Sequence, residues 1–224
     1  MTEKKLKALG ADAVERLKEK YPDAVCSLDY ANDPFRLLVM SVLSAQCTDK
    51  RVNIVSEALF GAYPDVQSMA AASVAEIENC IRSCGLAHTK AKNIKLTSEK
   101  LLAVYDGQVP CETEQLLSLP GVGHKIANLV RGDWFGLPAV VTDTHCIRIA
   151  GRIGFYPEEE KNPLRIERIL TRVIEDTEQS DFCHRLVMLG REICTARCPM
   201  CDRCPLLEIC RHASHPKKGS CKSK

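Results

Sequence analysis

The residues best suited to carry out chemistry stand in the segment Leu119–Arg131, which reads LPGVGHKIANLVR. Two glycines flank a valine in a compact turn, and helical periodicity resumes at His124. The backbone N–H groups that begin this second helix lack partners within the helix and suit a phosphate oxygen. Lys125 lies in the first helical turn, so a molecule that docks on the turn comes close to a primary amine. An ordinary corner between helices with a solvated lysine is the alternative, because GxG alone is a weak signal.

Four cysteines near the C-terminus follow a spacing that is typical of metal centres. The array C-x6-C-x2-C-x5-C directly follows a helical segment and consists of Cys194, Cys201, Cys204 and Cys210. Four thiolates can hold a structural zinc ion or a cubane iron–sulfur cluster, whose larger size suits the wider loops. The spacing therefore favours the cluster. Cys198 leaves the ligand set open, because either Cys198 or Cys194 could be the first ligand.

Asp143 and Gln46 are polar residues at predicted helix boundaries. Asp143 precedes the helical run that begins at Thr144, so capping of that helix is its simplest role. Gln46 falls at a corner between two helices, where a plain polar residue is an equally good interpretation. The pattern alone gives neither residue a chemical role.

The amino-acid composition limits which classes of protein are possible. The chain has 224 residues, of which 45% are hydrophobic and 27% charged, an ordinary balance for a globular protein with a core. Its net charge is only +2, but the chain from Cys194 on holds seven Lys or Arg and two Asp or Glu, a local charge of +5. A basic end of this kind is a candidate surface for phosphate, although basic tails are also common as solvated ends. Thirteen cysteines without a signal peptide or a long apolar run predict a soluble intracellular protein rather than a disulfide scaffold or a membrane protein.

Hydrophobic periodicity predicts an all-α fold of about ten helices with short connections. Ser73 and Glu76 form a predicted capping box, and Gly85 is expected to supply the turn that ends its helix. The polar tail after His212 is expected to be disordered. The main helical segments are predicted at 4–20, 34–46, 48–61, 73–85, 90–105, 112–119, 124–134, from 144 on, 162–176 and 181–193.

The hairpin LPGVGHK, the segment TDTH eighteen residues later and the cysteine array occur in one order and spacing. Together with PFRLLVMSVLSAQCTD they resemble the endonuclease III family of DNA repair glycosylases, nearly end to end from Leu6 to Cys210. The resemblance implies two helical lobes with DNA and a flipped base between them. One lobe is a six-helix barrel at about 27–137, which includes the helix–hairpin–helix at about 113–135. The other combines 1–26 with 138–212 around a [4Fe–4S] cluster with Cys194 as first ligand and Cys198 as a non-ligand, and 213–224 is a polar tail.

The same resemblance implies that the protein is a bifunctional DNA glycosylase and abasic-site lyase that removes oxidised pyrimidines. Lys125 would attack C1′ of the damaged nucleotide and form a Schiff base, so that the 3′-phosphate leaves by β-elimination. Asp143 would stabilise the cationic sugar and help to deprotonate the amine. Because the attacking amine must be neutral, we expect Lys125 to be partly buried at the positive end of the helix dipole.

Further residues are implied to contact DNA. Gln46 would fill the space that the flipped base leaves, Leu86 would wedge into the opposite strand, and Arg197 would contact backbone phosphate. The implied partner is double-stranded DNA with a damaged base or an abasic site, and the protein is expected to be a cytoplasmic monomer, associated with the nucleoid if bacterial. The hairpin would bind the DNA backbone through Gly121, Val122, Gly123 and His124.

Two other functions remain open at this point. A monofunctional glycosylase, such as the adenine-mismatch branch, fits less well because that branch lacks a lysine at position 125. A DNA-structure-binding protein without catalysis would have no need of both Lys125 and Asp143. Four departures from the family pattern leave the base preference open. His124 stands in place of the usual arginine, Leu117 in place of a residue that is often acidic, and Ile126 in place of a common threonine. In addition, Gly132 and Asp133 interrupt an otherwise apolar helix end.

Overall fold

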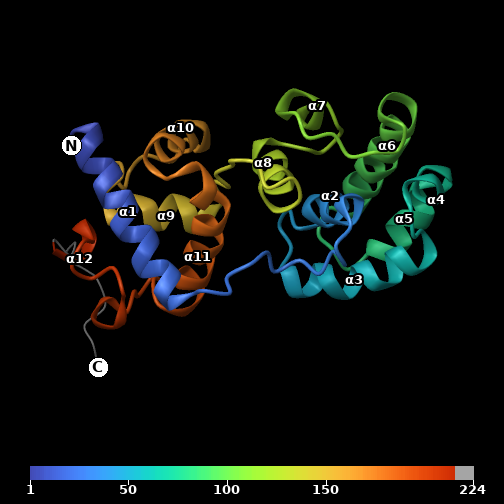
Figure 1. Ribbon diagram of the computed structural model, residues 1–224. Helices are drawn as coiled ribbons and strands as arrows, with labels where there is room; N and C mark the ends of the chain where they lie inside the picture. The colour runs from blue at the N-terminus through green and yellow to red at the C-terminus, as the bar shows by residue number, and fades with distance from the viewer. Residues whose placement is uncertain (215–224) are drawn as a thin grey trace. The chain divides into compact units, whose positions relative to one another are not determined.

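The structure is a computed structural model that describes residues 1–214, and the chain divides into two units. One unit joins Met1–Val25 to the chain from Leu137 on, and the other is Cys26–Gly136. The α-helices are labelled in Figure 1, and no β-strand occurs in residues 1–214. The all-α class predicted from periodicity is confirmed. Most of the predicted 213–224 tail lies outside the described residues.

The unit Cys26–Gly136 is built around α6, the longest of its helices. α4 and α5 pack against α6, while α2 packs against α3, α6 and α8. Its core is largely aliphatic, with Phe35 and Phe60 in an edge-to-face contact of 6.5 Å between ring centroids. Its helices are α2 (Pro34–Leu43), α3 (Asp49–Ala62), α4 (Val66–Ala71), α5 (Val74–Ile81), α6 (Ala87–Tyr105), α7 (Thr113–Leu117) and α8 (His124–Asp133).

Local capping fixes where several of these helices begin. Asp33 accepts hydrogen bonds from the first turn of α2, and the Thr48 hydroxyl accepts one from the Arg51 N–H at the start of α3. The capping box of Ser73 and Glu76 at the start of α5 is confirmed, with Glu76 accepting from the Ser73 N–H at 2.8 Å. Asp65 forms a second such box at the start of α4.

The other unit pairs the first helix with the last ones. α1 packs against α10 and α11, and α9 packs against α11 and α12. The apolar face of α1 contributes Ala13 and Leu17, both with no exposed surface, and Phe155 meets Phe182 edge to face. The elements are α1 (Glu3–Lys20), α9 (Thr144–Ile153), α10 (Pro163–Val173), α11 (Gln179–Glu192), α12 (Arg211–Ser214) and the 3-10 helices η1 (Asp176–Glu178) and η2 (Cys201–Arg203).

A network of charges links α1 to α11. Arg185, whose side chain is 3% exposed, donates to Glu178 at 2.7 Å and to Asp181 at 3.0 Å, and Lys18 donates to Glu178 at 2.9 Å. Burial acts to raise the pKa of Glu178, but the hydrogen bonds from Lys18 and Arg185 outweigh it and hold that pKa below its usual value. The carboxylate form of Glu178 therefore stabilises this unit.

Three details of the sequence prediction were wrong. The helix that begins at Pro34 ends at Leu43 rather than at Gln46, and α4 was not predicted. Gly85 does not supply the turn after α5, because the left-handed residue there is Leu86, with φ of 60°. α4 begins at the capping box of Asp65 and Ser68, a local signal that the sequence prediction overlooked.

Candidate active site

The hairpin between α7 and α8 is held rigidly by its own backbone and by α6. Gly121 has φ of 79°, and a Cβ added there would stand 2.7 Å from Asn93 Nδ2. The Thr97 hydroxyl donates to the Pro120 carbonyl at 2.9 Å, and the Val122 N–H donates to the Leu119 carbonyl at 3.1 Å. The glycine predicted for the first position of the turn is thus required by both torsion and space.

The second glycine of the hairpin has a different environment. Gly123 is the N-cap of α8 with φ of −103°, and a Cβ there would meet nothing within 4 Å. No side chain caps α8 in the described part of the chain, so its first N–H groups are available to an acceptor. Neither the backbone torsion nor the packing within the described residues requires glycine at position 123, contrary to the sequence prediction.

Lys125 and His124 lie side by side in the chain at the first turn of α8, and both are exposed. The partial burial that we expected for Lys125 is wrong for this structure. Its amine is accessible from solvent beside the uncapped helix start, where an anionic group would be attracted by the helix dipole.

Asp143 caps α9, as its position in the sequence predicts. Its Oδ1 accepts a hydrogen bond from the Cys146 N–H at 2.7 Å, and its own N–H donates to the Val141 carbonyl at 3.0 Å. The side chain is half-buried, and no partner for Oδ2 is found within residues 1–214. One carboxylate oxygen is thus fixed by the helix and the other is left for a ligand.

Gln46 and Leu86 occupy two neighbouring turns of the unit Cys26–Gly136. Both are exposed and both have left-handed backbones, with φ of 54° at Gln46 and 60° at Leu86. A Cβ on Gly85 would be 3.6 Å from the Gln46 carbonyl oxygen, which places the two turns side by side. Left-handed backbone at a non-glycine residue costs energy and is concentrated at functional sites. We call residues 44–48 and 82–86 the wedge corner.

The four cysteines of the array line one cavity. Arg152, Ile193, Met200 and His212 also contribute to its wall, whereas Cys198 does not. Cys198 instead takes part in a turn in which the Thr195 hydroxyl donates to its carbonyl at 2.7 Å. The described residues contain no group of three or more His, Cys, Asp or Glu side chains placed to hold a single metal ion. The cavity-lining thiols belong to Cys194, Cys201, Cys204 and Cys210.

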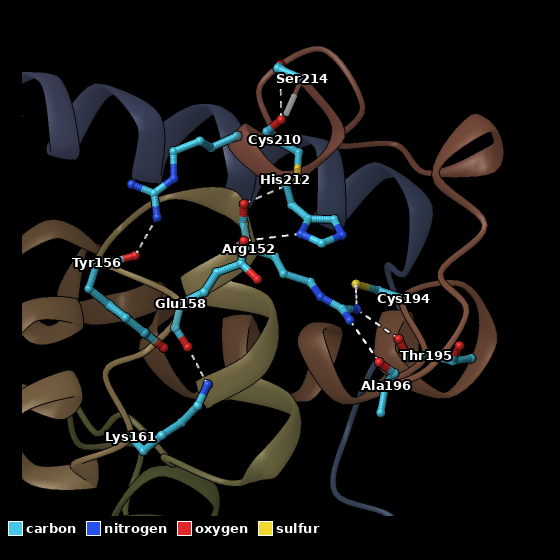
Figure 2. Close-up of polar contacts among 11 residues, drawn as sticks. Arg152, Tyr156, Glu158, Lys161, Cys194, Thr195, Ala196, Cys210, His212 and Ser214 are labelled. Atoms are coloured by element: carbon cyan, nitrogen blue, oxygen red, sulfur yellow. Dashed lines mark hydrogen bonds and ion pairs between the residues drawn. The ribbon is translucent and has the colours of Figure 1, made fainter. Parts of the chain in front are cut away.

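Arg152 of α9 organises the loop that contains the first of these cysteines (Figure 2). Its Nη1 donates to Cys194 Sγ at 3.2 Å and to the Thr195 carbonyl at 2.8 Å, and its Nη2 donates to the Ala196 carbonyl at 2.9 Å. The residue is only 9% exposed, so these bonds satisfy a nearly buried cation. Arg148 of the same helix donates to the Cys194 carbonyl at 3.0 Å.

The cavity disfavours ionised thiols unless a cation stabilises them. Burial, and then the neighbouring cysteines, raise the pKa of Cys204 to about 11, and burial also raises the pKa of Cys201 and of Cys210. Crowded thiols of this kind are the usual ligands of a soft metal centre, which lowers their pKa on binding. The donor set thus fits a soft metal centre with four sulfur ligands.

Arg197 is exposed in the loop that Arg152 holds in place. The carbonyls of Thr195 and Ala196, directly before it, are the two that accept from Arg152. α9 therefore positions both candidate groups of this unit. Asp143 caps its first turn, and Arg152 holds the loop that contains Arg197.

Sequence reasoning missed several residues that shape these sites. Lys90 is 3% exposed and donates to the Leu43 carbonyl at 2.8 Å, just before the wedge corner. Arg148 and Arg152 were missed as well, since both read as ordinary basic positions of an amphipathic helix. The sequence carries no local signal for any of these contacts, because each joins residues more than forty positions apart.

None of the helices in the described residues is long and apolar enough to cross a membrane.

The chain is similar to known DNA repair proteins. The family model for HhH-GPD superfamily base excision DNA repair proteins matches residues 39–176. Endonuclease III of Synechocystis sp. is 45% identical over 198 residues, which cover 88% of this chain and 89% of that protein. A non-covalent endonuclease III–DNA complex is 38% identical with a TM-score of 0.86, over 96% of this chain and 97% of that one. A trapped covalent endonuclease III–DNA intermediate has the same identity and TM-score, and the match covers 96% of this chain and 98% of that one. The chain therefore belongs to the endonuclease III family of the HhH-GPD superfamily.

Proposed function

We infer that this protein is a bifunctional DNA glycosylase and abasic-site lyase of base excision repair. The observation that carries this function is the exposed amine of Lys125 beside the uncapped start of α8. The family membership supports it, since an endonuclease III with the same fold has been trapped in a covalent complex with DNA. Its partner is double-stranded DNA that contains a damaged base or an abasic site, and we propose oxidised pyrimidines as the bases removed.

In the proposed reaction Lys125 supplies the nucleophile. Its neutral amine attacks C1′, the bond from C1′ to the base breaks, and the base leaves with the bonding electrons. Ring opening gives a Schiff base between Lys125 and C1′, which acidifies the C2′ proton. Loss of that proton drives cleavage of the C3′–O bond, and the 3′-phosphate leaves.

Asp143 is proposed as the carboxylate of the same reaction. Its Oδ1 is held by the Cys146 N–H, which fixes the carboxyl group at the start of α9. The negative charge stabilises the positive charge that develops on the sugar as the base departs. Asp143 also helps to take the proton from the attacking amine.

DNA binding is assigned to two surfaces of the unit Cys26–Gly136 and to one loop of the other unit. The uncapped start of α8 binds a phosphate oxygen through backbone N–H groups. At the wedge corner, Gln46 fills the space of the flipped nucleotide and Leu86, 57% exposed, inserts beside the opposite strand. Arg197 contacts a backbone phosphate. The hairpin contacts come from Gly121, Val122, Gly123 and His124.

A [4Fe–4S] cluster, which the family resemblance implies, fits the cysteine cavity. Its ligands would be Cys194, Cys201, Cys204 and Cys210, while Cys198 stays outside the cavity. Bound there, the cluster would cross-link the chain around η2 and contribute positive charge that stabilises the thiolates. Arg152 orients the Cys194 loop and thereby Arg197. We further propose that the two units correspond to a barrel lobe and a cluster lobe, and that the protein is a cytoplasmic monomer.

Borohydride trapping tests the proposed nucleophile. The protein is mixed with a duplex that carries one abasic site, borohydride is added, and denaturing electrophoresis detects a protein–DNA adduct. We expect an adduct with the wild type and with the control Lys92→Ala, which alters another exposed lysine, and none with Lys125→Ala. Asp143→Asn should slow release of thymine glycol more than it slows cleavage of an existing abasic site.

The alternatives give different results in the same assays. A monofunctional glycosylase would release the base without an adduct, and a DNA-structure-binding protein would bind the duplex without either reaction. An adduct of equal yield with Lys125→Ala would refute the assignment of Lys125.

A further inference from the structure

Two cysteines outside the cysteine array lie at the wedge corner. Cys47 follows Gln46 in the turn after α2, and Cys84 lies two residues before Leu86 in the turn before α6. Both are free thiols, and the Cys47 S–H donates to Cys84 Sγ at 3.7 Å. They come from segments 37 residues apart in sequence, so the fold rather than the chain brings them together.

The pair joins the two turns that carry the proposed wedge residues. Gln46 and Leu86 have left-handed backbones, and Gly85 packs against the Gln46 carbonyl. Beneath the corner, Lys90 of α6 donates to the Leu43 carbonyl at the end of α2. A covalent bond between the two sulfur atoms would therefore tie the two turns together, because each thiol belongs to the same turn as one of the proposed wedge residues.

The two thiols differ in their access to solvent. Cys47 is half-buried, whereas Cys84 is only 2% exposed. Burial, together with the hydrogen bond from Cys47, raises the pKa of Cys84 to about 11, although the charges of Lys90 and Arg51 oppose this rise. A small oxidant therefore reaches Cys47 first, and the buried Cys84 is placed to react with the oxidised Cys47 afterwards.

We propose that Cys47 and Cys84 form a reversible oxidation site that disables the wedge corner when they are joined as a disulfide. The oxidant is hydrogen peroxide, which is small enough to reach a half-buried thiol. The Cys47 thiolate attacks one peroxide oxygen, the O–O bond breaks, and a sulfenic acid forms. The hydroxide that leaves takes up the proton released by the Cys47 thiol and becomes water. Cys84 sulfur then attacks Cys47 sulfur, the S–O bond breaks, and a second water leaves. Two thiols lose two electrons and two protons, and one peroxide becomes two waters.

This change would displace the residues that contact DNA. A disulfide bond is about 2.05 Å long, so the sulfur atoms must close from 3.7 Å by about 1.7 Å. Displacements of about 1 Å at a reacting or positioning group cost on the order of 100-fold in rate. We expect oxidation to weaken binding of abasic-site DNA by about tenfold or more, and a thiol reductant to restore it. The effect on binding rests on the proposed roles of Gln46 and Leu86.

Peptide mapping tests the disulfide independently of DNA. The holoprotein is treated with hydrogen peroxide, blocked with an alkylating agent and digested with trypsin. Cys47 and Cys84 are the sole cysteines of the tryptic peptides 37–50 and 83–90. We expect these two peptides to be cross-linked in the oxidised protein and separate after reduction. Absence of the cross-linked pair would overturn the proposal.

Affinity for a duplex with a reduced abasic-site analogue is measured on the same samples, before and after peroxide and again after dithiothreitol. The ratio of oxidised to reduced affinity should fall in the wild type and in the control Cys80→Ser, which alters another half-buried thiol of this unit. It should stay near one in Cys47→Ser and in Cys84→Ala, and because these variants keep the cysteine array they control for oxidation of a cluster. A cross-link with unchanged affinity, or an equal loss in both variants, would overturn the proposal. Failure of the proposed function would instead appear as no binding by the reduced wild type.

Discussion

Replacement of Lys90 by methionine tests how the wedge corner is supported. Lys90 is 3% exposed, and its ammonium group donates to the Leu43 carbonyl at 2.8 Å. Methionine keeps most of the apolar length of the side chain but leaves this carbonyl without its partner. Loss of a buried hydrogen bond to a charged donor costs about 1.5–3 kcal/mol. Relief from burying an ammonium group offsets part of that cost, so we expect a net loss of about 1.5 kcal/mol in the free energy of unfolding.

Thermal unfolding followed by circular dichroism measures this loss. For a chain of this size, 1 kcal/mol corresponds to about 2–4 °C, so Tm should fall by about 3–6 °C. Because the Leu43 carbonyl lies three residues before Gln46, part of the loss should also appear in DNA binding. If about 1 kcal/mol of the lost free energy appears in the binding free energy, affinity for abasic-site DNA falls about fivefold. Lys92→Met on the exposed face of α6 is the matched control and should change neither quantity. An unchanged or raised Tm in Lys90→Met would refute the reasoning.

Three further predictions concern the hairpin, the cysteine loop and the acid stability. Gly121→Ala should lose about 1–2 kcal/mol in the free energy of unfolding, because φ of 79° is strained for alanine and its Cβ would meet Asn93. Gly123→Ala should unfold at the wild-type temperature. Any loss of its affinity for DNA would therefore indicate that DNA approaches closely at this position. Arg152→Lys should lose about 2 kcal/mol in the free energy of unfolding, because one ammonium group cannot replace the guanidinium hydrogen bonds to two carbonyls and a thiol. The iron-to-protein ratio of the purified variant should fall as well. The pKa of Glu178 is held below 4.5, so its contribution is present above that pH and is lost as pH falls through the folded-state value. Urea unfolding from pH 7 to pH 3 should therefore show a steeper acid loss of stability in the wild type than in Glu178→Gln.

The features that the sequence predicts well are those set by neighbours in the chain. The capping box at Ser73 and the N-cap at Asp143 depend on residues three positions away, and both are confirmed. The hairpin turn at Gly121 is likewise a local matter of torsion, although its contact with Asn93 adds a second reason that the sequence does not contain. The resemblance to a known family then supplied the fold and the function that the comparisons bear out.

The features that escape sequence reasoning depend on contacts between distant segments. Lys90 carries an ordinary surface residue type, and its burial follows only from the packing of α6 against α2. The approach of Cys47 to Cys84 likewise requires the two turns to be adjacent. The expected burial of Lys125 was wrong because the helix start places its side chain toward solvent. Periodicity gives a side chain's face on its helix, but not what the rest of the chain places over that face.

The discontinuous unit has a consequence for synthesis on the ribosome. α1 packs against α11, whose first residue Gln179 emerges about 160 residues after Lys20. At about 5–20 residues per second, translation takes roughly 8–32 s to cover that stretch. For most of this time, until α10 emerges from Pro163 on, the apolar face around Leu17 has no native helix to pack against, while all of Cys26–Gly136 has already been made. The nascent chain thus completes its central unit first and holds its opening helix as an exposed amphipathic segment until the final helices arrive.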